Sequence, residues 1–129
     1  MNKIKSVLLT SMLLLGVGIS NAQEKTTWKE QGQFHGIMSK TFHPSEEGNL
    51  TPLKEKSDSL VIVAKTWKAA PIPEGYKPKE TSESLTKLVK QCEGIEAAVK
   101  AKKDDKALAS MIKEAHDTFH YIVGECKTH

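Results

Sequence analysis

The sequence predicts an all-α protein, an antiparallel up-down-up-down four-helix bundle. Four stretches have apolar residues that recur every three or four positions, which is the period of an amphipathic helix. Most of the connections between them are short, as expected when neighbouring helices run antiparallel. Aromatic residues make up only 5% of the 129 residues and β-branched runs are scarce, so an all-β architecture is excluded. This length allows a single domain.

The N-terminus has the three parts of a secretory signal. Met1–Lys5 is basic, Ser6–Ile19 is apolar, and Ser20–Ala22 supplies small residues before a cleavage point. We expect cleavage after Ala22, which leaves 23–129 as one four-helix domain. The apolar segment is about 14 residues long, short of the roughly 20 that span a bilayer. No Cys follows the cleavage point, so we expect an exported, periplasmic or secreted protein without a membrane anchor.

The first two helices are predicted from their ends and their apolar stripes. One helix runs from about Trp28 to His43 and ends at Pro44, because the residue before a proline avoids the α region. Thr51 is the expected cap of the next helix and Pro52 fits its first position. This helix ends before Pro71, and its stripe consists of Leu53, Leu60, Ala64 and Trp67.

The last two helices show clearer apolar periodicity. One starts near Thr81 or Ser82 and continues to about Ala101, and the other runs from about Asp105 to Glu125 with Asp104 as its cap. The stripe of the first consists of Leu85, Leu88, Val89, Cys92, Ile95 and Val99. The stripe of the second consists of Leu108, Met111, Ile112, Ala115, Phe119, Ile122 and Cys126. Trp28 and Trp67 fall near one end of the bundle, as core anchors.

Composition narrows the function. Without Lys3 and Lys5 of the signal, the 19 basic residues fall to about 17, against 16 Asp and Glu, and none is Arg. A near-neutral chain without Arg is a poor nucleic-acid binder, so we expect no nucleic-acid partner. The chain has no Gly-rich phosphate loop and no Glu-x-x-His, the motif of di-iron bundles. We expect a binding protein rather than an enzyme.

Histidines on the first and last helices suggest a metal site. His116 and His120 are spaced i, i+4, so their rings lie on one helix face. At 1.5 Å per residue, His35, Cys92 and His116 lie at depths of roughly 13 to 17 Å from one end of the bundle. Met38 lies about one turn above this level and His120 about one turn below. These five residues predict a transition-metal site, with copper or zinc favoured by imidazole and sulfur ligands and nickel as a further option.

The same depths separate the two cysteines. Cys92 and Cys126 differ by roughly 16 Å along the bundle axis, beyond the reach of a disulfide. We therefore expect two free thiols. Because the bundle already has a core, the predicted metal need not be structural, and reversible binding for metal handling or sensing fits better. His43 lies at the C-terminal end of its helix, where a protonated histidine interacts favourably with the helix dipole. The loop that follows contains Glu46. In its functional interpretation this loop is a lid over the end of the bundle, with His43 or Glu46 as an extra metal ligand.

The helix layout resembles the cytochrome c′ and cytochrome b562 superfamily of exported four-helix bundles. Cytochrome c′ carries Cys-x-x-Cys-His near the end of its last helix, where this chain has Cys126-Lys127-Thr128-His129. One Cys is absent, so covalent haem is not expected. The b562 type holds haem between a Met on the first helix and a His on the last. The resemblance therefore implies a second hypothesis, haem b held by Met38 with His116 or His120. A third hypothesis is a cofactor-free interaction module, and a homodimer stays open in each case.

Overall fold

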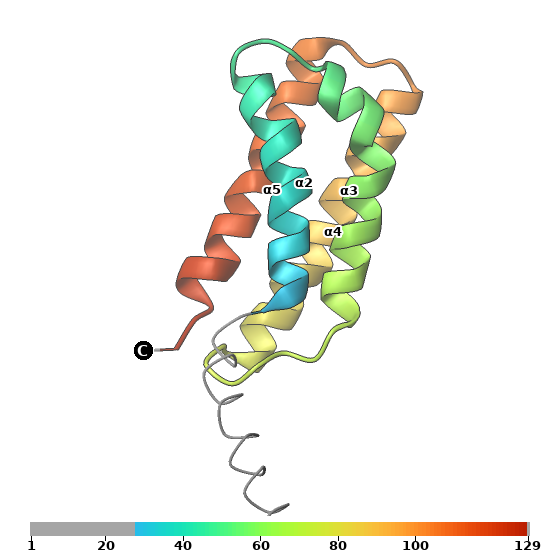
Figure 1. Cartoon of the computed structure of the whole chain (residues 1–129). Coiled ribbons are helices and arrows are strands. Elements are labelled where there is room, and N and C mark those ends of the chain that lie inside the picture. Colours follow the sequence, from blue (N-terminus) through green and yellow to red (C-terminus); the bar gives the residue numbers. More distant parts are fainter. Residues whose placement is uncertain (1–27, 129) are drawn as a thin grey trace, which may run out of the picture.

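The computed structural model describes residues 28–128 and shows four packed helices (Figure 1). They are α2 (Lys29–Glu46), α3 (Thr51–Ala69), α4 (Pro78–Lys100) and α5 (Asp105–Glu125). Each helix packs against the next one along the chain, and α2 also packs against α5, which closes the bundle. The predicted all-α class with four packed helices is confirmed. The predicted signal, residues 1–22, lies outside the described residues.

Figure 1 shows the connections at the two ends of the bundle. The α2–α3 and α4–α5 connections lie at one end, and the α3–α4 connection lies at the other. At that second end, the backbone amides of Lys77 and Thr128 donate to the carbonyls of Cys126 and Gly75, each at 2.7 Å. These bonds tie the α3–α4 connection to the residues after α5. None of the helices in the described residues is long and apolar enough to cross a membrane.

Two prolines set helix ends differently from the prediction. α2 continues through Pro44 to Glu46, because a proline in the last turn removes only one backbone donor. The Ser45 hydroxyl donates to the Phe42 carbonyl at 2.6 Å, and the Pro44 carbonyl accepts from the Glu47 amide at 3.0 Å. α4 begins at Pro78, three residues before Thr81, since a proline suits a helix start where its missing N–H has no partner.

The predicted cap is correct for α5 and wrong for α3. The Asp104 carboxylate accepts the Ala107 amide at 2.9 Å, so the predicted cap of α5 is confirmed. Thr51 is the first residue of α3 rather than its cap, so that prediction is wrong. The Thr51 amide instead donates to the Asn49 side-chain oxygen at 3.1 Å, which satisfies a donor that the helix leaves free.

The core is continuous along the bundle and rich in aromatic contacts. The rings of Trp28 and Trp67 meet edge to face with centroids 5.4 Å apart, which confirms both as core residues. Phe34 of α2 contacts Phe119 of α5 at 5.7 Å and Trp67 at 5.4 Å. Large rings therefore occupy the space between α2 and α5. The prediction of two free thiols is confirmed as well: Cys92 and Cys126 are both unpaired and buried.

Candidate functional site

Two histidines on α5 form the most chemically distinctive contact of the described chain. The Nε2 atoms of His116 and His120 are 3.1 Å apart, within hydrogen-bonding distance, and the ring centroids are 4.4 Å apart. The i, i+4 spacing places both rings on one helix face, one turn apart. His116 is half-buried and His120 is exposed. One nitrogen of the pair donates and the other accepts, so the two rings share one proton at this contact.

An aromatic ring of the neighbouring helix α2 packs against His116 of α5. Phe42 of α2 stacks on the His116 imidazole with centroids 3.8 Å apart and an interplanar angle of 11°. His120 meets Phe119 edge to face at 5.6 Å. The His116 ring plane is therefore fixed by packing between two helices, whereas His120 is exposed.

The surroundings of His116 favour its neutral form. Partial burial lowers the pKa of His116 first, and the nearby positive charges of His120 and His43 lower it further. The carboxylates of Asp117 and Glu46 oppose this shift but do not reverse it. A neutral imidazole is the form that binds a metal ion, so His116 is ready to act as a ligand at a lower pH than an ordinary histidine.

His43 and Glu46, in the last turn of α2, are the nearest charged groups from another helix. His43 Nδ1 lies 3.5 Å from the Glu46 carboxylate, and both side chains are exposed. Asp117 is engaged elsewhere, because its carboxylate pairs with the Lys113 amine at 3.1 Å. The predicted lid residues thus lie on the helix end that faces the histidine pair.

The other predicted ligands do not join the pair. His35 is exposed, its Nε2 atom lies 3.3 Å from the Ser39 hydroxyl, and its ring stacks on Phe119 of α5 with centroids 5.4 Å apart. Met38 is 1% exposed and belongs to the core. Cys92 is fully buried, and this burial raises the pKa of its thiol to about 12. In residues 28–128, no group of three or more His, Cys, Asp or Glu side chains is arranged to hold a metal ion. The sequence-derived depths set levels along the bundle but not directions, and a contact forms only between His116 and His120.

The packing between α2 and α5 near His116 does not fit haem. Phe34, Phe119 and Trp67 contact one another between α2 and α5, and the face of His116 is covered by Phe42. A macrocycle between Met38 and His116 would have to displace these rings.

Sequence reasoning missed Phe42 as a partner of His116. The available signal was the spacing of Phe34, Met38 and Phe42, which places all three on the inner face of α2.

Comparison of the chain with models of known protein families, with curated proteins and with solved structures found no match. The resemblance to cytochrome c′ and cytochrome b562 therefore remains one of helix layout. The function has to be argued from the histidine pair itself.

Proposed function

We propose that this protein binds a transition-metal ion through His116 and His120, for metal handling or sensing outside the cytoplasm. The scaffold of the proposal is an antiparallel up-down-up-down bundle that carries the pair on α5. The observation that carries the proposal is the separation of 3.1 Å between the two Nε2 atoms.

This separation matches a two-imidazole metal chelate. Imidazole nitrogens bind zinc at about 2.0–2.1 Å, so two Nε2 atoms 3.1 Å apart subtend about 98° at a shared ion. That angle lies between the square-planar angle of about 90° and the tetrahedral angle of about 109°. Copper, nickel and zinc are all compatible with it. Binding needs no backbone movement and replaces the proton that the pair shares.

A site with two protein ligands keeps open coordination positions. Water, a small molecule or a donor from a partner can fill them, and His43 is the nearest further imidazole on another helix. An exposed site of this kind exchanges its ion readily, which suits transfer or sensing better than a permanent structural role. Because the fold already buries a continuous core, the ion is not required for folding.

The test is calorimetric titration of the tag-free protein with Zn²⁺, Ni²⁺ and Cu²⁺. We expect one ion per chain, and we expect His116→Ala and His120→Ala each to weaken binding by about tenfold or more, since each leaves a single imidazole. His35→Ala is the matched control, because His35 is also an exposed histidine on a helix but has Ser39 instead of a histidine one turn away. If His35→Ala weakened binding as much as His116→Ala, a chelate formed by His116 and His120 alone would be wrong, and if His116→Ala left binding unchanged, the pair would be wrong as the site.

A further inference from the structure

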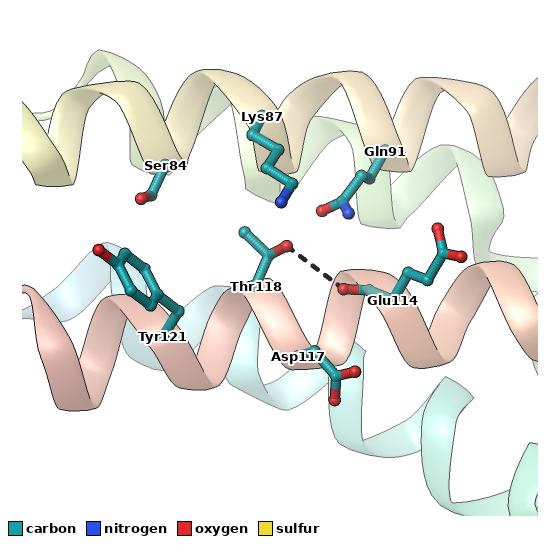
Figure 2. A pocket seen from close by; sticks show the side chains of 7 residues that line it. All are labelled: Ser84, Lys87, Gln91, Glu114, Asp117, Thr118 and Tyr121. Carbon is teal, nitrogen blue, oxygen red and sulfur yellow. Dashed lines mark hydrogen bonds between the residues drawn. The ribbon is translucent and has the colours of Figure 1, made fainter.

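A groove between α4 and α5 is lined by polar side chains from both helices (Figure 2). Its volume is about 430 Å³, within the range of small-molecule sites. α4 contributes Ser84, Lys87 and Gln91, at i, i+3 and i+7. α5 contributes Glu114, Asp117, Thr118 and Tyr121. The apolar stripes of α4 and α5 fill the seam itself, and these polar side chains line its solvent-facing edge, where Lys87 and Glu114 are exposed.

Gln91 provides the strongest sign of a ligand. Its side-chain carbonyl oxygen is one of four buried side-chain polar atoms without a hydrogen-bond partner in the described residues, and the one among them that belongs to this groove. A buried acceptor without a partner costs free energy, and native proteins keep few of them. Figure 2 shows Lys87 and Gln91 extending from α4 across the groove toward α5. A donor delivered by a bound molecule would satisfy this oxygen.

The charges in the groove nearly balance. The Lys87 amine is a cation without an ion pair in the described residues. The Glu114 carboxylate has no ion pair there either. Asp117 pairs with Lys113 and points away from α4 in Figure 2. A groove with one free positive and one free negative group does not favour an ion of either sign. It instead offers both donors and acceptors, among them the Lys87 amine and the Gln91 carbonyl oxygen.

Tyr121 adds a flat apolar surface. Its side chain is 47% exposed, one of two large hydrophobic side chains in the described chain with this degree of exposure. Figure 2 shows its ring at one end of the groove, beside Ser84. A tyrosine ring combines an apolar face with a hydroxyl tip, so it can lie against C–H groups while it hydrogen-bonds at its edge.

We propose that this groove binds a small uncharged saccharide of one or two rings. Each sugar hydroxyl both donates and accepts, which matches a lining with a lone acceptor at Gln91, a lone donor at Lys87 and a hydroxyl at Ser84. The apolar face of the sugar ring lies on Tyr121. The groove lies on another side of α5 from the histidine pair, because Thr118 and His116 are two residues and so about 200° apart around the helix, although Asp117, between them, lines the groove.

The test is a titration of the ¹⁵N-labelled protein with D-glucose, N-acetylglucosamine and maltose, followed by NMR. At roughly 10 mM sugar, we expect shifts of the backbone amides around Gln91 and Thr118 for at least one of the three. Lys87→Met and Gln91→Leu should each raise the dissociation constant about tenfold, since each removes a hydrogen bond. Lys90→Met is the matched control, because Lys90 is an exposed lysine on α4 that does not line this groove, and it should leave binding unchanged.

Glycine and sodium acetate serve as charged probes in the same titration. Shifts in the groove with glycine or acetate but with none of the sugars would overturn the saccharide assignment. The absence of groove shifts with any of the three sugars, in a protein whose spectrum remains folded, would overturn it as well. An equal effect of Lys87→Met and Lys90→Met would show that the sugar binds elsewhere. None of these outcomes bears on the metal titration, so the two proposals fail separately.

Discussion

Loss of one histidine of the pair should remove a metal-dependent gain in stability and leave the metal-free protein almost unchanged. His120 is exposed, and its ring meets His116 and Phe119 of its own helix. Its removal without metal should change the free energy of unfolding by no more than about 0.5 kcal/mol. A metal ion at about 100 times its dissociation constant stabilises the folded chain by about 2.7 kcal/mol. For a domain of this size that free energy raises the Tm by about 10 °C or more.

The same metal concentration should stabilise the His120→Ala variant less, by an amount set by the loss of affinity: a tenfold loss leaves about 1.4 kcal/mol. If the variant binds the ion about 100-fold more weakly, the concentration equals its dissociation constant and the gain falls to about 0.4 kcal/mol. The corresponding rise in Tm is about 2 °C. Thermal unfolding followed by far-ultraviolet circular dichroism, with and without Zn²⁺ or Ni²⁺ at pH 7.5, measures both values. His35→Ala should keep the full shift.

The double variant His116→Ala/His120→Ala distinguishes one shared site from two separate ones. Two ligands of one ion are strongly non-additive, because either single loss already breaks the chelate. The double variant should therefore lose no more of the metal-dependent shift than the larger single variant. A rise in the Tm of His120→Ala as large as that of the unchanged protein, or losses that add in the double variant, would refute the shared site.

Three further predictions follow from the described residues. In a Cys126→Ser background, Cys92 should react with iodoacetamide at pH 8 about a thousandfold more slowly in the native state than in urea. The reason is that burial raises the pKa of its thiol from 9.0 to about 12. Equal rates in the two states would show that the thiol is accessible. His120→Ala should raise the pKa of His116 toward its ordinary value, since a neighbouring positive charge is removed, and an NMR titration of the imidazole protons measures it. Asp104→Ala should destabilise the fold by about 1 kcal/mol in urea unfolding through loss of the α5 cap, whereas Asp58→Ala, an exposed residue within α3, should cost less.

The lowered pKa of His116 also fixes the sign of a pH effect. Between the folded pKa and the ordinary value of 6.5, the unfolded chain binds more protons at this position than the folded chain. Stability from this group is therefore complete above pH 6.5 and is lost as the pH falls through the folded pKa.

The fold could be predicted because each helix buries a stripe that the sequence displays. Along α5, Leu108, Ile112 and Ala115 are all fully buried, as the three- and four-residue spacing requires. The helix ends were less predictable because a proline has two opposite uses. The sequence predicts that the first helix ends at Pro44, but this proline lies within the last turn of α2. Pro78 precedes the predicted helix start near Thr81, but it is the first residue of α4.

The candidate site could be predicted only where it depends on a single helix. The contact between His116 and His120 follows from their spacing, whatever the rest of the bundle does. The larger ligand layer required correct rotation of three helices, and each residue step turns a helix by about 100°. Phe34 points into the core while the next residue, His35, is exposed, so one position separates a core side chain from a surface one.

The cysteine illustrates how a correct structural prediction can oppose the functional one. Cys92 was placed on the apolar stripe of its helix, and it is fully buried there. That same burial keeps the thiol protonated, whereas a metal ion binds the thiolate. A residue that is well suited to the core is thereby a poor ligand. The histidine pair avoids this conflict because His116 is buried just enough to favour its neutral form, and the neutral form of an imidazole is already the one that binds metal.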